Sequence, residues 1–240
     1  MGDHTTAIVL AAGQGKRMQT RVHKQFLTIH GYPLLYYCLK AFQESFVDDI
    51  VLVTGAEDVS YCKREIAERY GFHKVRKVIA GGRERYHSVY EGLKSCEEAD
   101  YVLIHDGARP MVTEEIMERT LGAARRFPGA AAAMPVKDTI RLADAQGFGA
   151  ATPDRSSLWM MQTPQTFSRP VILDAYKRFI EQEENGHTVA VTDDAMVLEY
   201  ISGGKVKLVE GSYENIKITT PSDLKIAEIF LKNTIDTTRQ

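Results

Sequence analysis

The sequence lacks several features that would assign it to a specialised class of protein. Its three cysteines, Cys38, Cys62 and Cys96, are odd in number and far apart, so they form no metal-ligand spacing. No apolar run approaches the roughly twenty residues that a helix needs to cross a bilayer, and no signal-peptide apolar segment follows the N-terminus. We therefore expect a cytoplasmic protein, with no membrane partner and with its thiols reduced and buried in helices.

An excess of charge of one sign is also missing. The 30 basic and 32 acidic residues leave a net charge of −2, which argues against a general nucleic-acid-binding surface. A chain of 240 residues can form one large domain or two small ones. Because no repeat, linker or low-complexity segment interrupts it, we expect a single domain over residues 1–240.

What the chain does have is an alternation of apolar strand-like runs with amphipathic helical segments. Strands are predicted at 7–10, 49–54, 75–79, 101–104, 130–136, 206–209 and 216–218. Helices are predicted at 59–70, 86–94, 168–182 and 193–200, after Thr113, and after Thr220. The run at 101–104 has no polar residue, which is typical of a strand buried on both faces. The order predicts an α/β fold, a mainly parallel sheet with helices on both faces.

The alternation breaks over residues 137–163. Residues 138–143 alternate between polar and apolar side chains, Gly147-Phe148-Gly149 predicts a turn, and a second extended stretch continues to Gln162. This pattern favours a long protruding β-hairpin arm over another strand–helix–strand unit. Trp159 with Met160-Met161 is either part of the core or an apolar face of the arm that needs a partner.

The first predicted strand ends in a glycine-rich stretch at 11–18, Ala-Ala-Gly-Gln-Gly-Lys-Arg-Met. Glycine lets backbone N–H groups approach phosphates, and Lys16, Arg17 and Lys24 add positive charge there. The spacing does not fit a P-loop, because no Gly-Lys-Ser/Thr follows Gly13 after four residues. It does not fit a dinucleotide fingerprint either, because Met18 stands where the third glycine would be. The stretch is either a nucleotide triphosphate loop or a plain strand-to-loop turn with solvated charges.

Three further stretches carry possible chemistry. Asp106 ends the buried strand, where open α/β sheets bind ligands, and a carboxylate beside a phosphate loop suits Mg²⁺; the alternative is a loop cap. Gly81-Gly82 precedes a helix and would let a base or ribose approach, unless it is an ordinary turn. Lys217, between Ile216 and Ile218, points either into the cleft or outward.

These motifs occur in a fixed order along nearly the whole chain. They are Leu10-Ala11-Ala12-Gly13-x-Gly15-x-Arg17-Met18, Lys24-Gln25-Phe26, Gly81-Gly82-x-x-Arg85-x-x-Ser88-Val89, His105-Asp106-x-Ala108-Arg109-Pro110, Val136-x-Asp138-Thr139-Ile140, Arg155-x-x-Leu158-Trp159, Gln162-Thr163-Pro164-Gln165 and Asn215-Ile216-Lys217-Ile218-Thr219. The set resembles the 2-C-methyl-D-erythritol 4-phosphate cytidylyltransferases of the non-mevalonate isoprenoid pathway. It is far more specific than any one of its members.

The resemblance implies a Rossmann-like fold, a homodimer formed through the arm, and a reaction of CTP with methylerythritol phosphate that releases pyrophosphate. It implies Arg17, Lys24 and Lys217 as catalytic contacts of the phosphates, and Asp106 as the ligand of Mg²⁺ or another divalent cation. The residues implied for CTP are Ala11, Ala12, Gly13, Gly15, Gly81, Gly82, Arg85, Ser88, Asp106 and Ala108. Those implied for the sugar-alcohol phosphate are Arg109 and, from the partner's arm, Thr139 and Arg155.

Some positions leave alternatives open. Some relatives carry an acid where this chain has Arg83, so we leave Arg83 out of the expected site. A second metal carboxylate is not evident, since Glu214 and Asn215 are both imperfect candidates. Ribitol 5-phosphate cytidylyltransferase is the nearest alternative activity, and a non-catalytic nucleotide-binding regulator is an alternative of another class. A regulator would be expected to have lost Lys24, Asp106 or Lys217, and all three are present.

Overall fold

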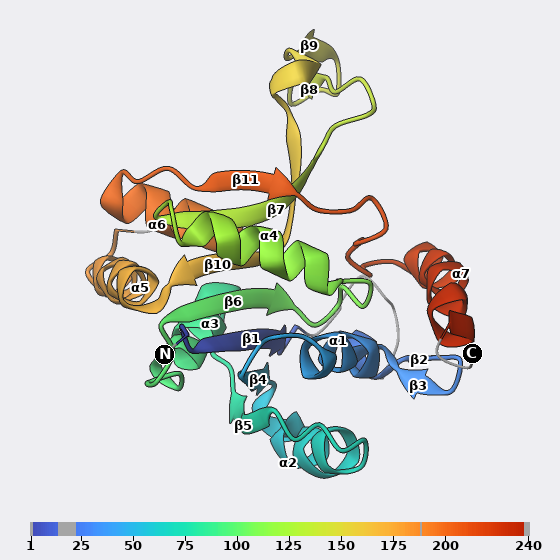
Figure 1. The fold of residues 1–240 in the computed structure, drawn as a ribbon. Helices are drawn as coiled ribbons and strands as arrows, with labels where there is room; N and C mark the ends of the chain where they lie inside the picture. The colour runs from blue at the N-terminus through green and yellow to red at the C-terminus, as the bar shows by residue number, and fades with distance from the viewer. Residues whose placement is uncertain (1, 14–22, 188, 238–240) are drawn as a thin grey trace.

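A seven-stranded sheet forms the centre of the molecule (Figure 1). The computed structural model describes residues 2–13, 23–187 and 189–237, with side chains as far as residue 232. The strand order is β11 (Lys207–Glu210), β7 (Gly129–Pro135), β10 (Trp159–Ser168), β6 (Tyr101–Asp106), β1 (Thr5–Ala11), β4 (Asp49–Thr54) and β5 (Val75–Ala80). Only β10 runs antiparallel to its neighbours, β6 and β7. The predicted mainly parallel sheet is therefore confirmed.

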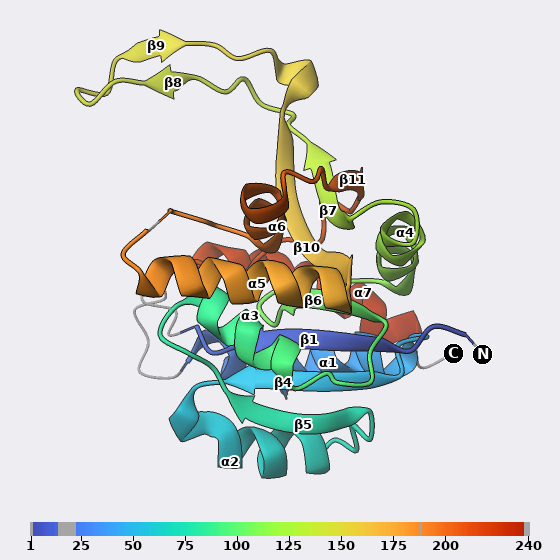
Figure 2. The same cartoon turned by 90° about the vertical axis from the view of Figure 1, so that its left-hand side faces the viewer.

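Helices cover both faces of this sheet (Figure 2). One face carries α3 (Arg85–Lys94), α5 (Arg169–Glu184) and α6 (Asp194–Ser202). The other carries α1 (Leu34–Glu44), α4 (Glu114–Ala124) and the helical segment that includes α2 (Val59–Tyr61). Along β1, Ala7 and Val9 pack in the second cluster while Ile8 between them packs in the first. Because successive strand residues face opposite sides, a strand covered on both faces is apolar throughout, as observed.

Several elements differ from the sequence-based expectation. The helix expected at 59–70 is divided: the α-helical turn α2 is followed by a π-helical stretch, Cys62–Glu68. No strand forms at 216–218. The backbone of these residues instead bonds to the loop after β6, where Ile218 N donates to Ala108 O at 2.8 Å. Cys96 lies just beyond α3 and not in a helix, although all three cysteines are buried and unpaired.

The hairpin arm lies between β7 and β10 and projects from the rest of the molecule (Figure 2). Its strands, β8 (Leu142–Ala143) and β9 (Gly149–Ala151), pair antiparallel, and the turn contains Gly147 with a φ of +88°. Every residue from Lys137 to Thr152 is exposed. The expected end of the arm is shifted, because Trp159–Met161 already pair with β7 as part of β10. Trp159, Met160 and Met161 are exposed there and are not core residues.

The C-terminal helix α7 (Pro221–Thr237) begins as the sequence predicts. The carboxylate of Asp223 accepts hydrogen bonds from Thr219 N and Thr220 N, both at 2.8 Å, which satisfies N–H groups at the helix start. Ala227 and Leu231 of α7 pack against α1 and the small hairpin β2 (Thr28–Ile29) and β3 (Tyr32–Pro33). Within the described residues, no helix is both long and apolar enough to cross a membrane.

Candidate active site

The carboxyl ends of β1, β4, β5 and β6 open into one cleft of about 720 Å³. Each strand end contributes to its wall, as the general rule for ligand binding in open α/β sheets requires. The sequence-predicted residues that line it are Ala11, Ala12, Gly13, Lys24, Gly81, Gly82, Arg85, Ser88, Asp106, Ala108 and Lys217. The volume is typical of a small-molecule site. The structure therefore brings these residues together, while their individual roles stay predictions.

Asp106 is the centre of the charge pattern in this cleft. It ends β6, is only 7% exposed, and is surrounded by three cations. Its Oδ2 lies 2.9 Å from Lys217 Nζ and 3.5 Å from Arg109 Nε, and its Oδ1 lies 3.6 Å from Arg85 Nε. Burial by itself raises the pKa of Asp106, but these three charges outweigh burial and hold the pKa well below its usual range. Asp106 is therefore a carboxylate at any physiological pH.

The segment 216–218 brings two lysines to the same side of the cleft. Its backbone is clamped at Ile218, whose N–H donates to Ala108 O at 2.8 Å and whose carbonyl accepts from Lys24 Nζ at 3.0 Å. Lys217 points inward to Asp106, which resolves the alternative that the sequence left open. Lys24 itself begins a single 3-10 turn, Lys24–Phe26, at which Gln25 Nε2 donates to Ala11 O at 2.5 Å. Two cations from distant parts of the chain thus share one wall.

The glycines at 81 and 82 are required by close packing. A Cβ on Gly81 would lie 2.5 Å from Ser88 Oγ, and one on Gly82 would lie 2.4 Å from His87 Cβ. Ser88 Oγ also accepts from Gly82 N at 3.1 Å, which closes the loop onto the first turn of α3. The sequence predicted close approach at these glycines, and within this chain the partner that approaches is α3.

Arg85 is held by a carboxylate that sequence reasoning missed. Its Nη1 and Nη2 donate to the two oxygens of Asp194 at 2.8 and 2.7 Å, and Asp194 is fully buried at the start of α6. Tyr176 O–H donates to the same carboxylate at 2.5 Å. Burial lowers the pKa of Arg85, but Asp194 and Asp106 raise it above its ordinary value. An acid at a helix start resembles an ordinary cap in the sequence, so only the fold could identify this partner.

Arg109 lies beside the cleft and is fixed by backbone carbonyls. It donates to Asn215 O at 2.8 Å and to Met161 O at 3.4 Å. The side chain of Asn215 bonds to β10, where its Nδ2 donates to Thr163 O at 2.9 Å and to Gln162 Oε1 at 3.3 Å. Asn215 therefore serves as a structural bridge between the segment 216–218 and β10.

Of the expected site residues that the structure describes, Arg109, Thr139 and Arg155 do not line the cleft. Thr139 and Arg155 are exposed on the arm, where Arg155 Nη1 donates to Lys137 O at 3.0 Å across its base. Gly15 and Arg17 lie outside the residues that the structure describes. Arg83, which we left out of the expected site, does line the cleft, and its guanidinium pairs with Glu183 at 3.2 Å.

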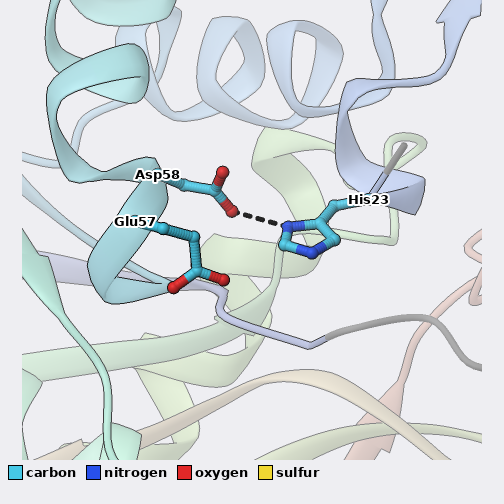
Figure 3. A group of neighbouring side chains, drawn as sticks. All are labelled: His23, Glu57 and Asp58. Carbon is cyan, nitrogen blue, oxygen red and sulfur yellow. Dashed lines mark hydrogen bonds and ion pairs between the residues drawn. The ribbon is translucent and has the colours of Figure 1, made fainter. Parts of the chain in front are cut away.

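A separate cluster of possible metal ligands consists of His23, Glu57 and Asp58 (Figure 3), of which Glu57 also forms part of the cleft wall. In the part of the chain that the structure describes, His23, Glu57 and Asp58 are the one set of three such side chains close enough to share an ion. His23 Nδ1 and Asp58 Oδ2 are already joined by a hydrogen bond of 2.6 Å. Asp106 is not part of the cluster.

The fold and the cleft define a nucleotidyltransferase: a glycine-lined site at parallel strand ends, with a buried carboxylate, Asp106, among lysines and arginines. Comparison with known proteins identifies the particular family. The family model described as 2-C-methyl-D-erythritol 4-phosphate cytidylyltransferase matches residues 5–233. The chain belongs to this family.

Individual members of this family are similar in sequence or structure to this chain over nearly their full lengths. The enzyme of that name from Lachnospira eligens is 50% identical over 95% of this chain and 99% of its own length, and that from Caldanaerobacter subterraneus is 44% identical over the same shares. Among solved structures, the 4-diphosphocytidyl-2C-methyl-D-erythritol synthase from Anaerococcus prevotii superposes with a TM-score of 0.82, at 33% identity and 96% coverage of each chain. The Rossmann-like α/β fold is shared with these enzymes.

Proposed function

We propose that this chain transfers the cytidylyl group of CTP to 2-C-methyl-D-erythritol 4-phosphate, giving 4-diphosphocytidyl-2-C-methyl-D-erythritol and pyrophosphate in isoprenoid biosynthesis. The observation that carries the proposal is Asp106 with Lys217, Arg85 and Arg109 around it, at the strand ends of the cleft. The nucleophile is a phosphate oxygen that is ionised at neutral pH, so the reaction needs no general base. Catalysis then consists of in-line positioning and neutralisation of charge on the α-phosphorus.

The two lysines supply much of that neutralisation. Lys24 and Lys217 lie on one wall with their backbone neighbours clamped, so their charges are in place before CTP binds. Fixed charges cost no reorganisation when the transition state forms, which makes them more effective than water. By its place in the glycine-rich motif, Arg17 also takes part in binding the phosphates. Cytosine and ribose bind against the backbone of Gly81-Gly82, beside Arg85 and Ser88.

The residues present fit a divalent cation, Mg²⁺ by our proposal. Mg²⁺ binds through one or two carboxylates and completes its coordination with phosphate oxygens and water. Asp106 offers one buried, always ionised carboxylate facing the cleft, and its ligand partners would be the phosphates of CTP. Bound there, the cation supplies charge neutralisation on the triphosphate. Lys217 and Lys24 remain to bind and orient the phosphates around it.

The arm supports a homodimer with shared active sites. Its exposed apolar residues include Ile140, Leu142 and Phe148, and Phe148 is 73% exposed. A lone two-stranded hairpin is marginal in water and an apolar patch needs cover, so the arm packs on a second copy. In a two-fold dimer each arm reaches the other protomer's cleft, where Thr139 and Arg155 bind the phosphate of the second substrate beside Arg109. The unpaired buried cysteines favour a cytoplasmic location.

The direct test is release of pyrophosphate from CTP and Mg²⁺ with each acceptor offered separately. Methylerythritol phosphate should react far faster than ribitol 5-phosphate. Equal or reversed rates would contradict the assigned acceptor while keeping cytidylyl transfer. Binding of CTP without turnover of either acceptor would instead support a nucleotide-binding regulator.

A further inference from the structure

His105 is a buried polar residue that the proposed chemistry does not use. It precedes Asp106 in β6, is fully buried, and packs edge-on against the ring of Phe42 with the ring centroids 5.2 Å apart. Neighbouring residues of a strand face opposite sides, so His105 is turned away from the cleft into which Asp106 points. A buried imidazole needs partners for both nitrogens.

The geometry fixes which nitrogen carries the proton. Nε2 of His105 lies 3.1 Å from the carbonyl oxygen of Arg109, which can only accept, so Nε2–H donates. In an imidazole with its proton on Nε2, Nδ1 is the acceptor, and its partner at 3.0 Å is the hydroxyl of Thr163.

Thr163 extends this chain of hydrogen bonds back to Asp106. Its Oγ1 accepts from Asp106 N at 3.0 Å while it donates to His105. The chain thus runs from the amide of Asp106 through the Thr163 hydroxyl and the imidazole to the carbonyl of Arg109. Thr163 reaches this point because β10 changes register with β7 between Met161 and Gln165, and such an irregularity re-aims a side chain.

We propose that His105 and Thr163 are positioning residues that fix the backbone on both sides of Gly107-Ala108, and so set the carboxylate of Asp106 and the guanidinium of Arg109 at their working separation. The proposal rests on the cleft roles assigned above to those two side chains. The loop between Asp106 and Arg109 is also held to β1, because Gly107 N donates to Leu10 O at 2.9 Å. The His105–Thr163 chain adds the connection to β10, from whose N-terminal end the arm extends.

The matched pair of variants is Thr163→Val and Thr166→Val. Both threonines are buried in β10, but the Thr166 hydroxyl donates to Thr120 Oγ1 at 2.8 Å, beneath α4 and away from the cleft. Both substitutions remove one buried hydroxyl from the same strand. Thr163→Ser, which keeps the hydroxyl, is the conservative variant.

The two bonds of His105 can be separated by a second pair of variants. Glutamine places an amide nitrogen near the position of Nε2 and can still donate to Arg109 O, whereas asparagine ends near Nδ1 and can only reach Thr163. His105→Asn should therefore raise KM for methylerythritol phosphate several-fold more than His105→Gln does. Equal values of KM in the two variants would contradict a specific role for the bond to Arg109.

The experiment measures pyrophosphate release with both substrates and Mg²⁺, together with the unfolding midpoint of each variant. Thr163→Val should lower kcat/KM roughly tenfold, which corresponds to one lost buried hydrogen bond. Thr163→Ser should restore most of it, and Thr166→Val should keep the wild-type value even if its midpoint falls equally. Equal kinetics for the two valine variants, or a serine variant as slow as the valine variant, would overturn the proposal. A wild-type protein without turnover would contradict the proposed function and the positioning with it.

Discussion

The cleft and the arm hold their candidate residues in opposite ways. In the cleft, Asp106 is 7% exposed and lies beside three cations: Arg109, three residues along the chain, and the distant Arg85 and Lys217. In the arm, every residue from Lys137 to Thr152 is exposed, and the contacts at its base include the bond from Arg155 to Lys137 O. The comparison teaches that the chain by itself brings together the residues proposed for CTP. The residues proposed for the second substrate on the arm, Thr139 and Arg155, would depend on a surface for the arm to pack against.

The largest expected effect is on the cleft side. Lys24→Ala should lower kcat by roughly 10²–10³, the range for loss of one preorganised transition-state contact. Steady-state kinetics with varied CTP would measure it, and Lys177→Ala on the exposed surface of α5 is the matched control. A Lys24→Ala variant with normal kcat and only a raised KM for CTP would show uniform binding and contradict the catalytic role.

Two phenylalanines, one in the central sheet and one in the arm, should differ in how much each contributes to the free energy of unfolding. Phe167 is fully buried in β10 against Gly129, whereas Phe148 at the arm's turn is 73% exposed. Phe167→Ala should lower the free energy of unfolding by about 3–5 kcal/mol, through lost burial and a cavity. Phe148→Ala should change it by no more than about 0.5 kcal/mol in the separated protomer.

The same two variants test the arm as an interface. Urea unfolding measures the stabilities, and sedimentation at a series of concentrations measures association. Phe148→Ala should weaken the dimer although it leaves the protomer stable. Unchanged association would mean that the tip of the arm is not part of the interface.

How much the sequence predicted also differs between the two regions. In the cleft, motifs that follow strands placed Gly81, Asp106 and Lys24 correctly in one cavity, because parallel strands bring their carboxyl ends together. The sequence could not identify contacts between residues that are distant in the chain. Asp194 lies 109 residues from Arg85, and no local pattern connects them.

Elsewhere the errors have local physical causes. The stretch 216–218 is apolar around Lys217, as a strand would be, yet its backbone bonds to the loop after β6 and forms no ladder. For the arm, alternation between polar and apolar residues predicted extended chain correctly. It could not tell where pairing with β7 begins, and so the boundary was misplaced to include Trp159–Met161.

The smallest expected effect concerns Asp223, which caps the start of α7. This helix follows closely after the segment 216–218. Burial raises the pKa of Asp223, but hydrogen bonds from Thr219 and Thr220 lower it below its ordinary value. The ionised carboxylate of Asp223 therefore stabilises the folded state fully above the pKa of about 3.9 that it has in the unfolded chain. This stabilisation is lost as the pH falls through the lower pKa of Asp223 in the folded state. Asp223→Ala should destabilise by about 1 kcal/mol at neutral pH.

The difference between Asp223→Ala and wild type should narrow on acidification below about pH 4. Urea unfolding at a series of pH values would measure this, with Asp174→Ala on the exposed face of α5 as the control. A constant difference across that range would show that the carboxylate charge contributes nothing to the cap.

The central claim is that each active site combines one protomer's cleft with the other protomer's arm. Lys24→Ala and Arg155→Ala should each be nearly inactive alone. After co-refolding, random pairing makes half of the dimers hybrids, and one of the two sites in each hybrid carries neither substitution. The mixture should therefore recover about a quarter of wild-type activity. A mixture as inactive as its parents, while hybrids demonstrably form, would show that Arg155 acts in its own subunit and would contradict the shared site.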